Sequence, residues 1–253
     1  MLKFKLPCPI TLSAMGSPFL ALASLTIASA QITTESSAQT TTEYFVSESP
    51  HWYAITHDPF CDELAAGTLP NATLTRYLVQ DHKFLDAFVV LLASMIAHAP
   101  TLADRVPGAQ FLALITGKEN TYFERSFDAL GLDAAARAAP PAPATSAFIG
   151  LMRRAAASGE LHAMLAVLVV AEWSYLSWGE RVVPRDGLSF LHLEWIDLHR
   201  GEYFAGVVAY LRGMLDALDL HASEMAIAKS YFDDAVKCEK DFWDMARGGE
   251  GEL

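Results

Sequence analysis

The sequence predicts an all-α protein built as a multi-helix bundle. From Tyr44 onward, apolar side chains recur at helical spacing, and almost nowhere do they alternate as in a half-buried β-strand. Turn-forming Gly and Pro clusters separate these segments, and no unit of roughly 20 to 50 residues repeats. With 253 residues, 52% of them hydrophobic, the chain can bury one substantial core.

The first half of the bundle is predicted to hold two long helices. The turn signal GTLPNAT introduces the first, which extends to about residue 99 with an apolar stripe that includes Leu74, Tyr77 and Leu78. The second is expected over residues 108–130 and ends at Gly131. Residues 132–146 are rich in Pro and Ala and are predicted to form a loop, because paired prolines end helices.

The second half is predicted to hold five more helices, over 147–158, 161–180, about 188–200, 201–220 and 223–247. The helix over 161–180 is apolar on more than one face, so we expect neighbours all around it. A membrane span is the alternative, because this run is close to 18 residues long. Glu172 in its middle, with Ser174 and Ser177 nearby, favours a core helix instead.

Residues 1–30 differ from the rest of the chain. They contain Lys3, Lys5, no acid and an apolar stretch that ends in Ala-Ser-Ala, which is typical of a secretory signal peptide. An organellar transit peptide and an artefactual extension of a cytosolic protein are the alternatives. Residues 31–46 are expected to be a polar linker. The helical domain is then expected over 47–247, followed by a short tail over 248–253.

The net charge of −12 and the absence of a Lys/Arg block argue against nucleic acid as a partner, because phosphate binding needs a basic surface. We also expect no membrane association of the mature chain. Cys8, Cys61 and Cys238 show neither a disulfide pattern nor zinc-ligand spacing.

Three acids lie on otherwise apolar helix faces. Asp81 shares a face with Phe84 and Phe88, Glu239 lies beside Phe242 and Trp243, and Glu172 has no basic residue within a turn. Each acid alone could be a helix-edge residue or half of an ion pair, and Glu239 with its neighbouring lysines could be solvated. Together, the acids and aromatic side chains are what a pocket for a flat, nitrogen-rich ligand needs, because a carboxylate can pair with an aminopyrimidine edge.

The sequence resembles the TenA / thiaminase II (TENA/THI-4/PQQC) family from about Ser47 to Arg247. The opening signature is matched by HDPF at 57–60, GTLP at 67–70 and YLVQD at 77–81 with Phe84, with one extra residue inside the first element. AEWSYLSWGE at 171–180 resembles the central helix of the family. EWIDLHRGEYF and CEKDFW resemble its last two motifs.

This resemblance implies a haem-oxygenase-like helical bundle that assembles as a homo-oligomer, a dimer or a tetramer. It implies hydrolysis of an aminopyrimidine produced by thiamin breakdown, with no metal or organic cofactor. Carried over, Asp81 would hold the aminopyrimidine edge, Phe84 would stack on the ring, Tyr175 would orient the nucleophile and Glu239 would protonate the departing amine.

The departures from the family pattern concern the same pocket. Ala171 stands where the better-known branch has a nucleophilic cysteine, and the next residue, Glu172, resembles the branch that lacks this cysteine. Two family tyrosines are replaced by Phe148 and His199, which we expect to line the substrate site. We therefore expect Glu172 to act as general base on water, or as nucleophile, on an amino- or formylamino-methyl pyrimidine in thiamin salvage.

Two other functions remain open from the sequence. One is a di-iron oxidase of haem-oxygenase-like fold, although no central helix carries a clean Glu-x-x-His pair. Its candidate ligands are Asp81, His82, Glu119, Glu172, His199 and Glu239. The other is a non-catalytic member of the family that binds a pyrimidine or a protein. Localisation is also open, because the signal-like start suggests secretion and the resemblance suggests a cytoplasmic or organellar protein.

Overall fold

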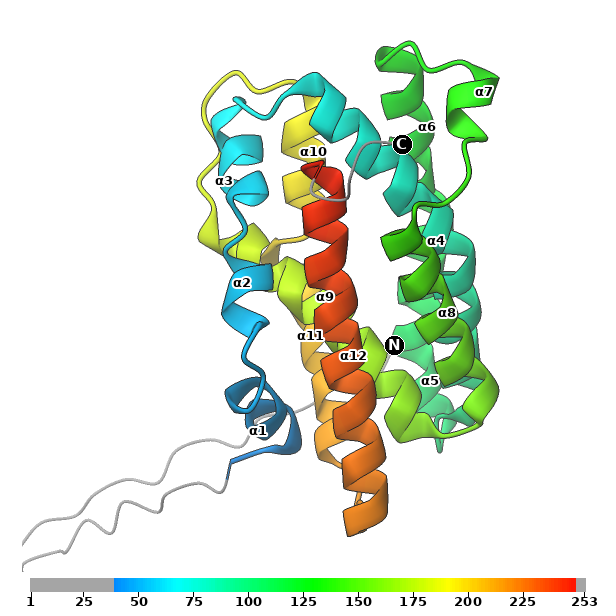
Figure 1. The fold of residues 1–253 in the computed structure, drawn as a ribbon. Coiled ribbons are helices and arrows are strands. Elements are labelled where there is room, and N and C mark those ends of the chain that lie inside the picture. Colours follow the sequence, from blue (N-terminus) through cyan, green and yellow to red (C-terminus); the bar gives the residue numbers. More distant parts are fainter. Residues whose placement is uncertain (1–38, 249–253) are drawn as a thin grey trace, which may run out of the picture. The chain divides into compact units, whose positions relative to one another are not determined.

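The computed structural model describes residues 39–248, and all regular structure within them is helical, as the sequence predicts (Figure 1). The helices run in the order α1 (Thr41–Ser47), α2 (Trp52–Thr56), α3 (Pro59–Ala66), α4 (Asn71–His98), α5 (Leu102–Leu114), η1 (Ile115–Glu119), α6 (Asn120–Ala129), α7 (Ala134–Arg137), α8 (Pro143–Ser158), α9 (Leu161–Arg181), α10 (Phe190–Leu198), α11 (Gly201–Asp216) and α12 (Ala222–Ala246). The predicted signal-like segment, residues 1–30, lies outside the described residues.

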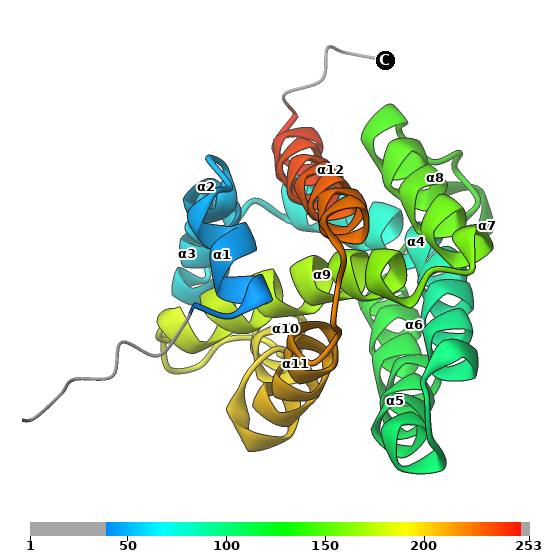
Figure 2. The same ribbon diagram turned by 90° about the horizontal axis from the view of Figure 1, so that it is seen from below.

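Helix α9 is the centre of the bundle, as predicted. It contacts α2, α4, α8, α11 and α12, and Figure 2 shows it passing between α12 on one side and α11 on the other. All ten residues from His162 to Ala171 are buried. By length and composition α9 could cross a membrane, but 72% of its most apolar stretch is buried within the protein, which is the burial of a core helix.

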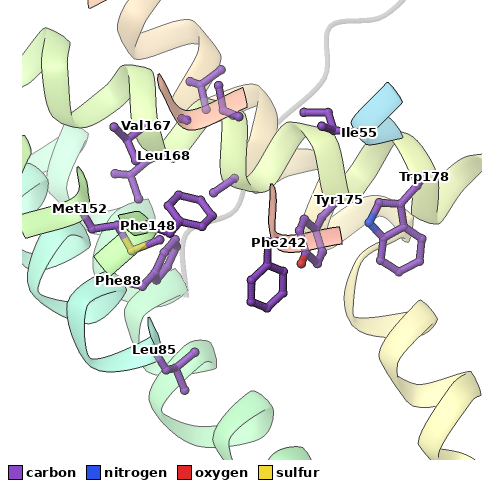
Figure 3. Packing of buried hydrophobic residues seen from close by; sticks show 14 of the residues in the cluster. Ile55, Leu85, Phe88, Phe148, Met152, Val167, Leu168, Tyr175, Trp178 and Phe242 are labelled. Carbon is purple, nitrogen blue, oxygen red and sulfur yellow. The ribbon is translucent and has the colours of Figure 1, made fainter. Parts of the chain in front are cut away.

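The core around α9 is a continuous layer of aromatic and branched side chains. Figure 3 shows Phe88, Phe148 and Met152 clustered beside α9, with Tyr175 and Phe242 farther along it. Phe148 is 1% exposed and packs near Phe84, with ring centroids 5.5 Å apart. This layer gives the central helix its neighbours and leaves the few polar side chains of α9 surrounded by apolar atoms.

The expected polar linker over 31–46 is wrong at its end, because Thr41–Ser47 form helix α1. Thr40 and Glu43 form a capping box at its start. The carboxylate of Asp216, at the end of α11, accepts hydrogen bonds from the Thr42 backbone N–H (2.7 Å) and hydroxyl (3.0 Å). Phe45 packs on Phe232 with ring centroids 5.4 Å apart. These tertiary contacts stabilise a helix that polar composition alone does not predict.

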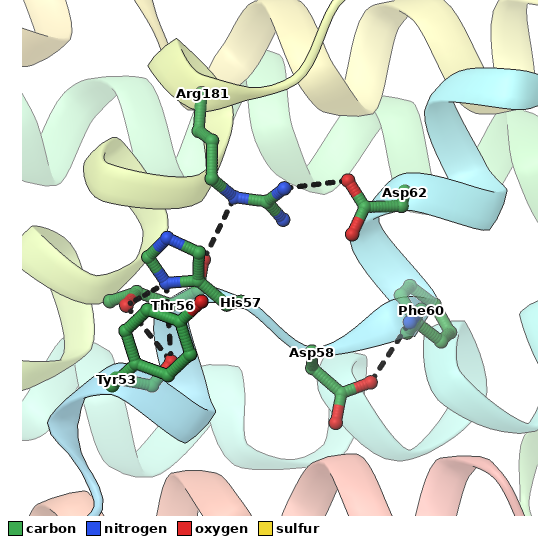
Figure 4. Close-up of polar contacts among 7 residues, drawn as sticks. All are labelled: Tyr53, Thr56, His57, Asp58, Phe60, Asp62 and Arg181. Carbon is green, nitrogen blue, oxygen red and sulfur yellow. Dashed lines mark hydrogen bonds and ion pairs between the residues drawn. The ribbon is translucent and has the colours of Figure 1, made fainter.

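The HDPF segment at 57–60 builds the start of α3 (Figure 4). The Asp58 carboxylate caps this helix by accepting from the Phe60 N–H at 2.9 Å, and Pro59 occupies its first turn. Arg181 fixes the segment to the end of α9, since it donates to the Thr56 carbonyl (3.2 Å) and to Asp62 (2.6 Å). Phe60 is fully buried against Tyr77. The signature therefore has a structural role.

In the middle of the chain, the structure differs from two predicted segments, a loop and a helix. The loop expected over 132–146 contains the short helix α7, and α8 begins within it at Pro143, which is a favourable first-turn residue. The helix expected over 108–130 is interrupted, because residues 115–119 form a π-helix, η1, between α5 and α6. A π turn contains an extra residue, so it shifts the helical register by roughly 100°.

Gly179 allows α9 to approach the segment that follows α10. A Cβ atom at this position would lie 2.2 Å from the His199 carbonyl oxygen, so only glycine fits here. The adjacent Glu180 carboxylate accepts a hydrogen bond from the Gly201 N–H at 2.7 Å, at the start of α11. These two residues of the central motif thus fix the position of His199.

Candidate active site

A cavity with about 420 Å³ of empty volume, part of it open to solvent, lies inside the bundle against α9. Side chains from α4, η1, α8, α9, α12 and the α10 region line it. All seven of the predicted site residues are among them: Asp81, Phe84, Phe148, Glu172, Tyr175, His199 and Glu239. The three acids that the sequence places on apolar helix faces line one cavity in the structure, together with a fourth, Glu119.

Helix spacing explains how α4 delivers its side chains to the cavity. Asp81, Phe84, Leu85 and Phe88 follow at steps of three and four, which places them on one face. Phe84 lies between Phe148 of α8 and Phe242 of α12, with ring centroids 5.5 and 5.4 Å away. An aromatic side chain in this position offers a flat ligand a stacking surface.

Tyr175 forms the polar edge of the cavity on α9. Its hydroxyl is 2.7 Å from the hydroxyl of Tyr77, in a buried hydrogen bond. Burial raises the pKa of both phenols well above the usual value, so both hydroxyls stay protonated at neutral pH. Tyr175 is therefore held as a hydrogen-bond donor or acceptor and carries no charge.

His199 lines the cavity as a neutral imidazole. Burial lowers its pKa to about 4, although the hydrogen bond between Nδ1 and the Trp195 carbonyl oxygen (2.8 Å) opposes this shift. Because a carbonyl only accepts, Nδ1 carries the proton and Nε2 has a free lone pair. Phe148 and His199, which replace two family tyrosines, thus give the cavity one apolar wall and one neutral polar group.

The carboxyl groups of the cavity have no cationic partner. Neither Lys nor Arg lines the cavity, and none of the ion pairs between described residues involves these four acids. Asp81, Glu119, Glu172 and Glu239 are each at most 8% exposed. Oδ1 of Asp81 has no hydrogen-bond partner among the described residues. Buried polar atoms are normally paired, so this arrangement points to a ligand that supplies donors.

Burial and mutual repulsion set the protonation of these acids. Burial raises the pKa of Asp81 well above its usual range, and Glu119, Glu239 and Glu172 raise it further. The pKa of Glu172 is raised first by burial and then by Glu119 and Glu239. Burial raises the pKa of Glu239 as well. Carboxyl groups that repel one another in this way do not all ionise, so the cavity holds protons at neutral pH.

Glu119 is the acid that the pocket prediction missed, since it was considered only as an iron ligand. A signal for it is present in the sequence, because Phe111, Ile115, Glu119, Phe123 and Phe127 recur every four residues. In an α-helix such a stripe drifts by roughly 40° per step, or roughly 160° over four steps. The π turn compensates for this drift, and all five side chains are buried.

The two thiols in the part of the chain that the structure describes lie away from the cavity lining. Ala171 lines the cavity where the family resemblance places a cysteine, whereas Cys61 is buried in α3 and Cys238 is partly buried on α12. Burial raises the pKa of both thiols, that of Cys238 to about 12. Neither therefore provides a thiolate nucleophile in this cavity.

The arrangement of possible metal ligands does not favour the di-iron alternative. Among the described residues, no three His, Cys, Asp or Glu side chains have the geometry to hold a metal ion. His82, one of the six candidate ligands, is outside the cavity lining and lies 3.1 Å from the Asn120 side-chain oxygen.

An all-α bundle with acids and aromatic rings around an internal cavity defines a class of helical proteins that bind small molecules between their helices. Within this class the chain belongs to the TENA/THI-4/PQQC family, whose model matches residues 47–249. Its fold is the haem-oxygenase-like bundle of that family.

Three relatives illustrate this membership. The chain is 27% identical to an aminopyrimidine aminohydrolase of Halalkalibacterium halodurans, over 78% of this chain and 90% of the relative. It is 26% identical to the aminopyrimidine aminohydrolase of Bacillus subtilis, over 76% and 83%. A crystal structure described as a TenA family transcription regulator, from Silicibacter sp. TM1040, superimposes with a TM-score of 0.72 at 26% identity, covering 81% of this chain and 96% of the other.

Proposed function

We propose that the protein hydrolyses the exocyclic C–N bond of an aminomethyl- or formylaminomethyl-pyrimidine, as a thiamin-salvage enzyme of the branch that uses glutamate in place of cysteine. The observation that carries this proposal is the cavity in which Asp81, Glu172 and Glu239 meet Phe84 without any cationic side chain. The relatives named aminopyrimidine aminohydrolase support the same substrate class.

Asp81 is proposed to bind the pyrimidine edge, because its unpaired oxygen can accept from an exocyclic amino group and a carboxyl pairs with two adjacent ring positions. Phe84 is proposed to stack on the ring. Phe148 supplies the apolar wall behind Phe84. Tyr175 and His199, whose rings are 4.8 Å apart, are proposed to orient the attacking water from the other side of the cavity.

For the aminomethyl substrate the proposed step is a displacement by water. The water oxygen forms a bond to the methylene carbon, and the C–N bond breaks with its electron pair leaving on nitrogen. Glu172, as general base, takes a proton from the water, and the nitrogen leaves as ammonia with the proton that Glu239 gives to a neutral amine or that an ammonium arm already carries. The products are the hydroxymethyl pyrimidine and ammonia. With a formylaminomethyl substrate, the same pair acts at the formyl carbon and releases formate.

The roles of general base and proton donor require that Glu172 and Glu239 differ in protonation. Glu172 must be ionised and Glu239 protonated at the same pH, which requires that one proton be shared unequally between them. Both groups have raised pKa values, and the repulsion between them ensures that they do not ionise together.

The test is to incubate the purified chain with aminomethyl- and formylaminomethyl-pyrimidine and with thiamin, and to follow products by chromatography. We expect turnover of a pyrimidine and none of thiamin. Glu172→Gln is expected to remove this turnover, and Glu160→Gln, an exposed glutamate just before α9, serves as the matched control. Full pyrimidine turnover by Glu172→Gln would overturn the mechanism, and binding without turnover by the unaltered chain would favour a non-catalytic member.

A further inference from the structure

Glu119 has no task in the proposed reaction, yet the fold places it in the cavity. It is the last residue of η1, it is 7% exposed, and it lines the same space as Asp81 and Glu172. The three residues before it, Thr116, Gly117 and Lys118, are exposed. The π turn therefore directs the carboxyl of Glu119 into the interior, as it does the side chain of Ile115, while the three residues between them face solvent.

A buried carboxyl of this kind is costly unless a ligand compensates it. No described side chain or backbone group donates a hydrogen bond to Glu119, and the cavity lining offers it only other acids and neutral groups. The polar and titratable side chains that share the cavity with it are Asp81 from α4, Glu172 and Tyr175 from α9, His199 after α10 and Glu239 from α12, and Asp81 and Glu172 are close enough for its charge to raise their pKa values. Burial raises the pKa of Glu119 to about 8. A cation in the cavity would reverse this effect by stabilising the ionised form.

The two candidate substrates differ in the charge of the arm that they carry. An aminomethyl arm is an ammonium ion at neutral pH, with three N–H donors and a positive charge, whereas a formylamino arm is a neutral amide. The unpaired Oδ1 of Asp81 shows that the cavity has unused acceptors. Three other groups, Asp81, Glu172 and Glu239, already have proposed roles, which leaves Glu119 as the acid available for the amine.

We propose that Glu119 is a specificity-determining residue that binds the ammonium arm of the substrate, so that the cavity selects the charged amine over the neutral amide. This inference rests on the proposed function. The carboxylate of Glu119 pairs with the ammonium group, and the proton of Glu119 passes to solvent when the arm arrives as ammonium, or to the nitrogen when the arm arrives as the neutral amine. A neutral amide forms no such ion pair, and Glu119 remains protonated beside it.

The test compares kcat/KM for the aminomethyl and the formylaminomethyl pyrimidine in the full chain and in Glu119→Gln. We expect the value for the amine to fall roughly ten- to hundredfold, the range for losing a hydrogen bond to a charged group. The loss should appear mainly in KM, and the value for the amide should change less than about threefold. Glu119→Asp, which keeps the charge on a shorter side chain, should recover part of the preference for the amine.

Glu124→Gln is the matched control, because Glu124 follows five residues later in α6 and is exposed. It should change neither value. An equal fall for both substrates in Glu119→Gln, or no change in their ratio, would overturn the inference and leave the proposed function intact. If the unaltered chain turns over neither pyrimidine, the proposed function fails. Calorimetry then tests Glu119 alone, since the ratio of the amine Kd to the amide Kd must still rise in Glu119→Gln.

Discussion

The burial of Glu172 in the middle of α9 follows from its place at the cavity. A carboxyl with no basic partner survives in a core only if it is protonated or faces a ligand, and Glu172 lines the cavity. The same reasoning covers Asp81 and Glu239, which are 3% and 2% exposed. The polar residues that interrupt apolar stripes thus mark the cavity.

The opposite protonation states proposed for Glu172 and Glu239 predict a bell-shaped pH dependence of kcat/KM. Glu172 acts when ionised, so activity falls as pH drops, and its raised pKa moves this acid limb above the usual glutamate range. Glu239 acts when protonated, so activity falls again as pH rises. Glu239→Gln should remove the alkaline limb and lower the maximum by about 10²- to 10⁴-fold. A profile with the same two limbs in this variant would reject the assignment.

Glu119 also predicts how stability depends on pH. Its pKa is raised from 4.5 in the unfolded chain to about 8, so the folded state binds the extra proton between these values. The free energy of unfolding should therefore fall as pH rises from about 4.5 to 8, by at most roughly 5 kcal/mol from this group (3.5 × 1.36). Urea titrations at several pH values should show a flatter dependence for Glu119→Gln, and Glu124→Gln should retain the original slope.

At the scale of elements, the contact between α9 and the end of α10 depends on Gly179. A methyl group there would meet the His199 carbonyl at 2.2 Å, so Gly179→Ala requires the two segments to separate. We expect a loss of about 1–3 kcal/mol in unfolding free energy, together with lower activity, because His199 moves.

Gly206→Ala is the control for this substitution. Gly206 lies within α11 and a Cβ atom there meets nothing within 4 Å. It should stabilise the protein by about 0.5–1 kcal/mol through the higher helix propensity of alanine. Equal stability of the two variants would contradict the close approach.

Helix α1 depends on a tertiary contact in the same way. Asp216→Ala removes the carboxylate that accepts both hydrogen bonds from Thr42, so we expect α1 to open more often. A loss of about 1–2 kcal/mol corresponds to amide exchange roughly ten times faster over residues 41–47. Exchange in α9 should not change. Asp219→Ala, an exposed residue just after α11, should leave α1 as it is.

These elements also show which parts of the fold can be predicted from the sequence. Apolar periodicity predicted α4, α9, α11 and α12, because their stripes are long and regular. It missed α1, whose stability comes from Asp216, 174 residues away from Thr42. It also missed η1, because a stripe with steps of four was treated as ordinary α-helix. Residue spacing predicted that three acids face the core, but only the packing of six segments shows that they meet.

At the scale of the whole molecule, the cavity joins elements far apart in the chain. Asp81 in α4 and Glu239 in α12 line the same cavity, so a ligand between them contacts helices from the first and the second half of the chain (Figure 1). A ligand that binds only the folded state stabilises it by RT ln(1 + [L]/Kd). Occupancy of the cavity should therefore be visible in global unfolding.

We expect the aminomethyl pyrimidine at about 100 times its Kd to add roughly 2.7 kcal/mol, which raises the Tm of a protein of this size by about 5–10 °C. Differential scanning fluorimetry of Glu172→Gln, in which turnover is removed, measures this shift. Asp81→Asn in the same background should reduce the shift, and an equal shift in both would contradict binding of the ring by Asp81.

The π turn at residues 115–119 has a consequence for how this cavity could arise. One inserted codon in an α-helix is absorbed as such a turn, which shifts the helical register by roughly 100° at the insertion while the flanking helices keep their packing. Loss of one residue at Thr116 or Gly117 would rotate Glu119 out of the interior in a single genetic event. The number of acids in this pocket, and with it the charge of the molecules it accepts, can therefore change in lineages of this family by an insertion or deletion, without any substitution at the residues that perform the chemistry.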